Sequence, residues 1–332
     1  MTMIAMLDIA AIDGVLDMRG AIDLLEKTLA REAGGGTSVS PKFTTDFDGG
    51  AMRVLIAADS AAGYCAMKAY HSIKGVGTRY VVLLYRLKDG ELLAMIDGRL
   101  ITDLRTGAAS GVAARKVPIH EPVSIGIIGS GNQARTQLES LAAVYAVEAA
   151  TVYSPTPANR EVFAIDMSAR LGLPVTPAVS AADAVRGRQV VITASNARNA
   201  DPVVYGKWLQ DCRLLCAVGN TRRHFAELDL QCFRNAGLVI VDSLHAIEEA
   251  GELRLAAAAG ELPESKCSTL AQVVTGAAGV PSGGLVIFKS VGTALQDLAL
   301  AAHYYEALAG KPGIVMAPNV ASLRAKPLSP GN

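Results

Sequence analysis

Apolar and polar residues are spaced differently before and after Pro118. In the first part, apolar positions at helical spacing predict a helix over residues 18–32, which Gly34-Gly35-Gly36 ends. Short runs rich in Val, Ile, Leu and Tyr predict strands, and Lys88-Asp89-Gly90 is a turn signal between two of them. We therefore expect an antiparallel or mixed sheet with helices. Its predicted strands are residues 53–58, 80–87 and 92–96, and a further helix covers residues 102–114.

After Pro118, short and mostly apolar strands alternate with helices. This alternation is typical of βαβ units, which build a parallel sheet with helices on both faces. The final helix, residues 293–309, can return to the first part of the chain. We therefore expect a discontinuous first domain, residues 1–118 with 296–332, and a second domain of residues 119–295. The second domain has expected strands at 123–128, 149–153, 173–176, 189–194, 212–218 and 237–241, and expected helices at 134–145 and 163–171; the tail after residue 311 is expected to be extended.

The composition supports a folded, neutral protein of two domains. The 332 residues exceed the ~100–200 of one typical domain, and 51% apolar against 19% charged residues can fill a sizeable core. Lys plus Arg and Asp plus Glu are both 31, so the formal net charge is zero. This balance removes the main electrostatic argument for binding nucleic acid or an anionic membrane, and it is compatible with an oligomer.

The sequence favours a protein without an export signal, membrane span or metal site. The N-terminal segment carries Asp8 and Asp13 and no basic lead-in, so we expect no signal peptide. The longest charge-free run, residues 268–288, contains four glycines and a proline, which argues against a span. Cys212 and Cys216 form the one close cysteine pair, in an apolar stretch without a nearby His. We expect reduced thiols, no metal and a cytoplasmic protein.

A dinucleotide-binding fingerprint follows the first strand of the second domain. Gly129-Ser130-Gly131-Asn132-Gln133-Ala134 matches G-x-G-x-x-[G/A]. The pattern alone is weak in a chain with 32 glycines, but here it follows an apolar strand and opens a helix, as the motif requires. Gly129 permits the tight turn, Gly131 lets the backbone approach a pyrophosphate, and Ala134 lets the helix pack closely. We predict a Rossmann doubly wound sheet with a nicotinamide cofactor; the alternative is a Gly-rich turn without a ligand.

The end of the second strand of this domain carries no acidic residue, whereas NAD enzymes usually hold the ribose there with Asp or Glu. The strand continues into Ser154-Pro155-Thr156-Pro157, with Arg160 one turn further. Two hydroxyls and a guanidinium suit a phosphate dianion better than a ribose diol. We therefore predict NADP, used as NADPH, in preference to NAD. The alternative is that Ser154 and Thr156 merely cap the next helix.

Two more loops follow strands of the same predicted sheet. Thr193-Ala194-Ser195-Asn196 comes after the fourth strand, and Val218-Gly219-Asn220-Thr221 after the fifth. Ligands bind at the carboxyl ends of parallel strands. We expect these loops to contact the cofactor through Thr193, Ala194, Ser195, Val218 and Gly219.

Four motifs together resemble the ornithine cyclodeaminase and μ-crystallin family. They are ITDLRTGAA at 101–109, IGIIGSGNQAR at 125–135, ELD at 227–229, and FKSVG at 288–292 with Gln296-Asp297-Leu298 after it. They occur in the family's order and at roughly its spacing. The resemblance implies a dimerising, substrate-binding mixed α+β domain before the Rossmann domain, hence a homodimer. It also implies that Val291 and Gly292 contact the cofactor.

The resemblance further implies that Lys68 reaches the substrate and that Arg105 holds its carboxylate. A planar guanidinium can bind a carboxylate at two points, and a lysine near an imine nitrogen can supply a proton. Lys42 falls where the family often has a second carboxylate-binding arginine, although Lys offers a point charge in place of a fork. The alternative is that Lys68 and Arg105 are ordinary surface residues.

One position departs from the cyclodeaminase pattern. Two residues after Gly219, cyclodeaminases place an aspartate that handles protons, and Thr221 stands there in this chain. A hydroxyl cannot act as a carboxylate base near neutral pH, and reductase-like members are similar in carrying a small neutral residue. Because Thr221 cannot do this work at the catalytic position, the proton must come from Lys68, water or His71. We expect His71 to have a structural role.

These expectations favour an NADPH-dependent, homodimeric reductase of α-imino acids. Expected substrates are cyclic ketimines such as pyrroline-2-carboxylate or piperideine-2-carboxylate, or open-chain imines of 2-oxo acids. Three alternatives remain from the same family: an ornithine cyclodeaminase, an alanine dehydrogenase-like amino-acid dehydrogenase, and an NADPH-binding protein without catalysis.

Overall fold

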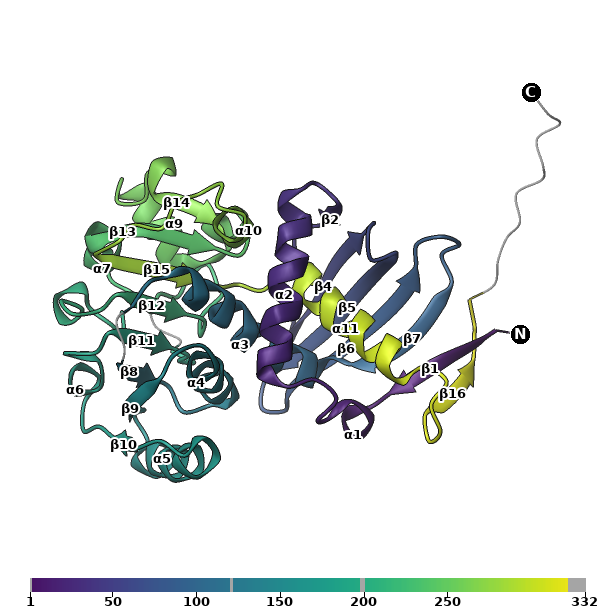
Figure 1. The fold of residues 1–332 in the computed structure, drawn as a ribbon, viewed down its shortest axis with the longest axis horizontal. Helices are drawn as coiled ribbons and strands as arrows, with labels where there is room; N and C mark the ends of the chain where they lie inside the picture. Colours follow the sequence, from purple (N-terminus) through teal and green to yellow (C-terminus); the bar gives the residue numbers. More distant parts are fainter. Residues whose placement is uncertain (1, 120–121, 198–200, 322–332) are drawn as a thin grey trace.

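The computed structural model describes residues 2–119, 122–197 and 201–321, which form two eight-stranded sheets side by side (Figure 1). The first sheet has the strand order β16-β1-β7-β6-β5-β4-β2, with β3 beside β4, and only the pair β1 and β7 is parallel. The predicted mixed sheet is confirmed. Its strands are β1 (Met3–Leu7), β2 (Thr37–Val39), β3 (Phe43–Phe47), β4 (Gly50–Asp59), β5 (Tyr64–Ile73), β6 (Gly77–Arg86), β7 (Leu92–Asp97) and β16 (Val315–Pro318).

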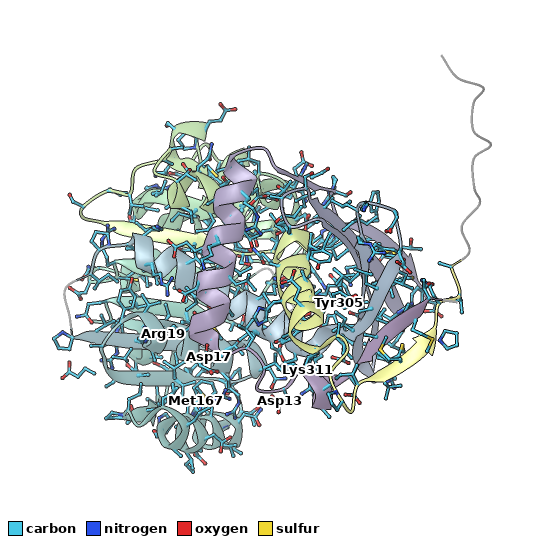
Figure 2. All side chains as sticks on the ribbon, turned by 45° about the vertical axis from the view of Figure 1, so that its right-hand side comes forward. Asp13, Asp17, Arg19, Met167, Tyr305 and Lys311 are labelled. Carbon is cyan, nitrogen blue, oxygen red and sulfur yellow. The ribbon has the colours of Figure 1, made fainter. Side chains whose placement is uncertain are left out.

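Helices cover one face of the first sheet, which we call the inner face. The last helix of the chain, α11, crosses this face against β4, β5 and β6, as its predicted return to the first part requires (Figure 1). The second helix, α2, begins after Asp17, whose side chain accepts a hydrogen bond from the N–H of Gly20; Figure 2 labels Asp17 at the lower end of this helix. The helices of this part are α1 (Ile9–Ile12), α2 (Met18–Ala33), α3 (Gly98–Lys116) and α11 (Ala294–Leu308).

The second sheet is parallel throughout and has the order β10-β9-β8-β11-β12-β15-β13-β14. The strand order reverses at β8, between β9 and β11, which is where ligands bind in such sheets. The predicted Rossmann sheet is confirmed. The strands are β8 (Val123–Ile128), β9 (Val147–Tyr153), β10 (Val175–Pro177), β11 (Val190–Thr193), β12 (Leu214–Ala217), β13 (Ala236–Val241), β14 (Cys267–Thr269) and β15 (Leu285–Lys289).

Helices flank both faces of this parallel sheet. One apolar core extends from the inner face of the first sheet, through α2, α3 and α4, to one face of the second sheet, and a second core lies on the opposite face. The two lobes are thus packed together through shared apolar side chains. The helices are α4 (Asn132–Val144), α5 (Pro157–Leu171), α6 (Ala181–Val185), α7 (Leu230–Asn235), α8 (Ala246–Glu249), α9 (Gly251–Ala258) and α10 (Leu270–Val274).

Several predicted bounds differ from the structure for local reasons. The helix expected at residues 163–171 begins at Pro157, because proline is well tolerated in the first turn of a helix. The expected extended tail contributes β16, which pairs antiparallel with β1, while residues 322–332 lie outside the described residues. Within the described part of the chain, no helix has the length and hydropathy to span a membrane, and no group of His, Cys, Asp and Glu is arranged to hold a metal. Cys212 and Cys216 are buried free thiols.

Candidate active site

The fingerprint turn after β8 has the backbone geometry that a pyrophosphate site needs. Gly129 has φ +114°, and a methyl group on it would collide with the carbonyl of Ala194. Gly131 precedes α4 without a side-chain cap, and a methyl group there would meet no protein atom within 4 Å. Ala134 is fully buried against the sheet. Because no side chain caps the N-terminus of α4 and space is open beside Gly131, these residues fit a bound dinucleotide phosphate.

Glu227 holds the two loops that follow β11 and β12. Its fully buried carboxylate accepts hydrogen bonds from Ser195 N and Oγ, at 2.9 and 2.7 Å, and from the backbone N–H groups of Gly219 and Asn220, at 2.9 and 3.0 Å. Lys289 lies 4.0 Å from it. The structure thus places the predicted loop residues Thr193, Ala194, Ser195, Val218 and Gly219 at one edge of the sheet, beside the fingerprint.

At the end of β9, the three predicted phosphate-binding residues differ in exposure. Ser154 is 6% exposed, and its Oγ lies 3.1 Å from Oγ of Ser130. Thr156 is exposed at the start of α5, and its side chain makes no capping hydrogen bond. Arg160 donates to the carbonyl of Ser154 at 2.8 Å and lies over the ring of Tyr153 at 5.5 Å. Thr156 is therefore not the capping side chain of the alternative interpretation.

Lys68 and Arg105 are both buried, not surface residues, and they share one carboxylate. Lys68, on the inner face of β5, is 2% exposed, and its Nζ lies 2.7 Å from Oδ1 of Asp297 and 2.6 Å from Oγ1 of Thr102. Nε of Arg105 lies 3.2 Å from the same Asp297 oxygen. Two cations and one carboxylate leave a net positive charge in a buried place, which a substrate carboxylate can neutralise.

The helix α3 aims the guanidinium of Arg105. The side chain of Asp97 caps α3 by accepting from the N–H of Arg99, and Thr102 and Arg105 then share one face of the helix at i and i+3. Nη1 of Arg105 donates to Oε1 of Gln296 at 3.1 Å. Among the described residues, Oδ2 of Asp297 and Nε2 of Gln296 are buried without hydrogen-bond partners. Such buried polar atoms are typical of a site that binds a polar ligand.

Burial lowers the pKa of Lys68 from its usual value to about 8. Desolvation is the largest cause; the Asp297 carboxylate opposes it, and the charge of Arg105 adds to it. A lysine with this pKa exchanges its proton near neutral pH, as a general acid must.

The connection from β15 to α11 carries Val291 and Gly292 to Arg105. The buried Asp242 accepts hydrogen bonds from Ser290 Oγ at 2.8 Å, and from the N–H groups of Val291 and Gly292 at 3.0 and 2.6 Å. Gly292 has φ +79°, and a methyl group on it would collide with the guanidinium of Arg105. The Rossmann sheet is thereby joined directly to the predicted carboxylate site.

Three other sequence candidates lie apart from the Lys68 cluster. Lys42 forms an ion pair with Glu249, 2.7 Å between Nζ and Oε2. His71 is exposed on β5 and, three residues from Lys68, faces the opposite side of the sheet. Thr221 is half-buried beside Asn220 in the loop after β12. The side chain of Asn220 donates to the carbonyl of Ala197 at 3.0 Å, which orders this loop.

A cleft of about 570 Å³ runs between the lobes next to this cluster. Gly292, against which Arg105 packs, lines it, and so does Leu55, which stands opposite Lys68 in the β4–β5 register. Gly292 and Leu55 therefore lie between the Lys68 cluster and this cleft. Its polar lining includes Lys42, Glu249, Glu32 and Asp242.

A model of the ornithine cyclodeaminase/mu-crystallin family matches residues 3–312. The chain belongs to this family. The resemblance drawn from the four motifs is confirmed, and the match also covers the chain before the first of these motifs.

Relatives within the ornithine cyclodeaminase/mu-crystallin family include imino-acid reductases. A curated Δ(1)-pyrroline-2-carboxylate reductase of Bacillus cereus is 33% identical over 230 residues, which are 68% of this chain and 70% of the relative. The structure of Thermococcus litoralis Δ(1)-pyrroline-2-carboxylate reductase in complex with NADH and L-proline has a TM-score of 0.87 at 29% identity, covering 92% of this chain and 97% of that chain. An archaeal alanine dehydrogenase dimer with bound NAD has a TM-score of 0.88 at 25% identity, covering 96% and 99%. These comparisons support an oxidoreductase with a nicotinamide cofactor.

Sequence reasoning did not assign roles to four carboxylates that organise this site. Asp297 and Glu227 lie in motifs that carried the family resemblance, but their partners come from distant segments. Asp242 directly follows an apolar strand, which is a signal that could have marked it. Glu249 lies in a short acidic run, Glu248-Glu249, that resembles an ordinary solvated helix face.

Proposed function

We propose that this protein reduces α-imino acids to amino acids, using NADPH. The observation that carries the proposal is the buried cluster in which Lys68 and Arg105 share the carboxylate of Asp297, next to an interdomain cleft. The substrates we propose are cyclic ketimines such as pyrroline-2-carboxylate or piperideine-2-carboxylate, or open-chain imines of 2-oxo acids. Relatives named for pyrroline-2-carboxylate reduction support this choice.

In the proposed reaction, Arg105 binds the substrate carboxylate and fixes the α-carbon. Its Nε and Nη1 are oriented by Asp297 and Gln296, so the fork loses little freedom when it binds. Lys68 donates a proton to the imine nitrogen and so makes the C=N carbon more electrophilic. A bound nicotinamide cofactor would supply the hydride to that carbon. Hydride and proton together convert C=N to CH–NH, and Lys68 recovers its proton from solvent.

We further propose that the cofactor is NADPH in preference to NADH. Thr156 and Arg160 support it, because an exposed hydroxyl and a guanidinium at the end of β9 suit a phosphate dianion. The buried Ser154 would contribute by holding the fingerprint through Ser130. Structures of relatives contain NADH or NAD, which lack the 2′-phosphate of NADPH. We therefore propose that Arg160 is the residue that makes this chain prefer NADPH to NADH.

We propose a homodimer formed by the first domain, residues 1–118 with 296–332. On β4, β5 and β6, the side chains that alternate with Leu55, Lys68 and Val82 point away from the helices. An apolar sheet face of this kind is typical of an interface. Sedimentation velocity at micromolar concentration tests it: a dimer is expected, and a monomer would contradict it. The apolar outward-facing residues include Val54, Ile56, Met67, Val81 and Leu83, and the paired His71 and Arg79 lie on the same face.

The test of the proposed function compares two reactions. Consumption of NADPH with an imino acid, with the corresponding amino acid as product, supports the reductase. Release of ammonia from ornithine without net change of the cofactor would instead identify a cyclodeaminase, which Thr221 disfavours because it cannot act as a carboxylate base. Cofactor binding without turnover of any imine would favour a binding protein.

A further inference from the structure

The charged residues that line the cleft beside Arg105 limit which substrate side chains can bind there. This inference rests on the proposed function. A substrate carboxylate bound at Arg105 lies next to Gly292, which lines the cleft. The rest of the substrate then extends toward the other lining residues. The charges of those residues therefore decide which side chains the site accepts.

Lys42 is the lysine of this lining, whose other basic residue is His245, and Glu249 neutralises Lys42. The ion pair measures 2.7 Å and bridges the loop between β2 and β3 in one lobe and α8 in the other. The Lys42 and Glu249 side chains are only 11% and 23% exposed, so water screens the pair weakly. Lys42 also lies 3.5 Å from the carbonyl of Val291. An ammonium held by a carboxylate and a carbonyl offers little attraction to a second anion.

Two further carboxylates make the cleft lining acidic. Asp242 is 1% exposed, and the described residues donate to it only neutral hydrogen bonds, from Ser290, Val291 and Gly292. Glu32, at the end of α2, has its pKa raised to about 7 by burial and by the charge of Asp242. Because Lys42 and Glu249 cancel, the cleft lining itself keeps the negative charge of Asp242, to which Glu32 adds above neutral pH, whereas the positive charge of Arg105 and Lys68 lies outside the lining.

We infer that the Lys42–Glu249 pair makes this protein selective for imino acids with a single carboxylate, and that Glu249 is the residue that excludes dicarboxylic imino acids. The carboxylate of the substrate has its place at Arg105. A second carboxylate on the side chain would enter a lining that repels it, because Lys42 is already paired. Apolar side chains, or side chains with a hydroxyl or amino group, meet no such repulsion.

The experiment measures kcat/KM for the methylamine imines of 2-oxohexanoate and 2-oxoglutarate, which are similar in length and differ in one carboxylate, with pyrroline-2-carboxylate as the activity control. Wild type should prefer the 2-oxohexanoate imine by at least about tenfold, the factor that one partly screened charge produces. Glu249→Gln frees Lys42 and should shift this ratio about tenfold toward the dicarboxylic imine. Glu248→Gln, an exposed neighbour on α8, is the matched control and should leave the ratio unchanged.

Each outcome separates the specificity from the proposed function. An unchanged ratio in Glu249→Gln, or equal use of both imines by wild type, overturns the inference while leaving a reductase in place. If no imine is turned over, the proposed function is contradicted. The specificity is then tested by the binding of amino acids, measured as shifts of the unfolding temperature. With NADPH present, L-norleucine should raise the unfolding temperature of wild type more than L-glutamate does. Equal shifts would overturn the inference, and Glu249→Gln should remove the difference.

Discussion

Nζ of Lys68 lies 2.7 Å from Oδ1 of Asp297, although 229 residues separate the two in the sequence. The same oxygen lies 3.2 Å from Nε of Arg105. One carboxylate, in the first turn of α11, therefore orients both cations. The proposed proton donor and the proposed carboxylate anchor thus both depend on Asp297.

Asp297→Asn should lower kcat/KM about 100-fold, because Lys68 and Arg105 lose the group that aims them. The substitution also removes the charge that opposes the lowering of the Lys68 pKa, so the alkaline fall of kcat/KM should move to lower pH. The measurement is a pH profile of both proteins at a temperature where thermal unfolding shows them folded. A lower rate with an unmoved profile would mean that Asp297 is merely structural.

The rate should depend on pH through Lys68. Its pKa is lowered to about 8, and it must be protonated to act as a donor, so kcat/KM should fall as pH rises above about 8. In Lys68→Arg the guanidinium stays charged, which removes that fall, and the rate should be about 10²–10⁴-fold lower because arginine is a poor proton donor. A profile unchanged in Lys68→Arg would contradict the assignment.

Arg105→Ala should raise KM and lower kcat while leaving NADPH affinity nearly unchanged. The guanidinium contacts Asp297 and lies against Gly292, and it makes no hydrogen bond to the fingerprint turn among the described residues. Fluorescence titration of NADPH and imine kinetics separate the two effects. Arg99→Ala, an exposed arginine at the start of the same helix, is the control and should behave as wild type. Loss of NADPH affinity in Arg105→Ala would show that the division of roles is wrong.

Arg160→Ala should weaken NADPH binding more than NADH binding, by about tenfold or more, because a charge-assisted contact to the phosphate is lost. The dissociation constants of both cofactors are the measurement. Arg170→Ala, on the same helix and exposed, should change neither. If the preference between the two cofactors stays the same in Arg160→Ala, the argument for NADP fails.

Two glycines of the fingerprint should respond differently to alanine. Gly131→Ala meets open space in the protein, so its unfolding temperature should change little while NADPH affinity falls, because the methyl group occupies the path of the pyrophosphate. Gly129→Ala meets the carbonyl of Ala194 and a φ of +114°, so it should destabilise the fold itself. Equal loss of stability in the two variants would contradict this account of the turn.

The Rossmann part of the fold could be predicted from the sequence because its signals are local. The turn at Gly129 follows a short apolar strand and opens a helix within a dozen residues. The strand β5 was not predicted, although it carries Lys68. Lys68 points toward the core, where the alternating pattern of a strand predicts an apolar side chain, and this hid the strand in the sequence. The carboxylate of Asp297 compensates the buried charge of Lys68.

The assembly of the site could not be predicted from spacing. Helical periodicity indicates α11, but not that Asp297 reaches β5 across the inner face. Likewise, Lys42 and Glu249 lie 207 residues apart and meet only once the two lobes pack. The sequence placed Lys42 among the substrate ligands, and the structure pairs it with Glu249, which changes the charge that it offers.

The proposed imino-acid reductase activity is tested most directly by the loss of nicotinamide absorbance when the protein is mixed with NADPH and pyrroline-2-carboxylate, with NADH in parallel. We expect steady oxidation of NADPH and formation of proline, faster than with NADH. NADPH that binds but is not oxidised by pyrroline-2-carboxylate, piperideine-2-carboxylate or the imine of pyruvate and methylamine would contradict a reductase of α-imino acids.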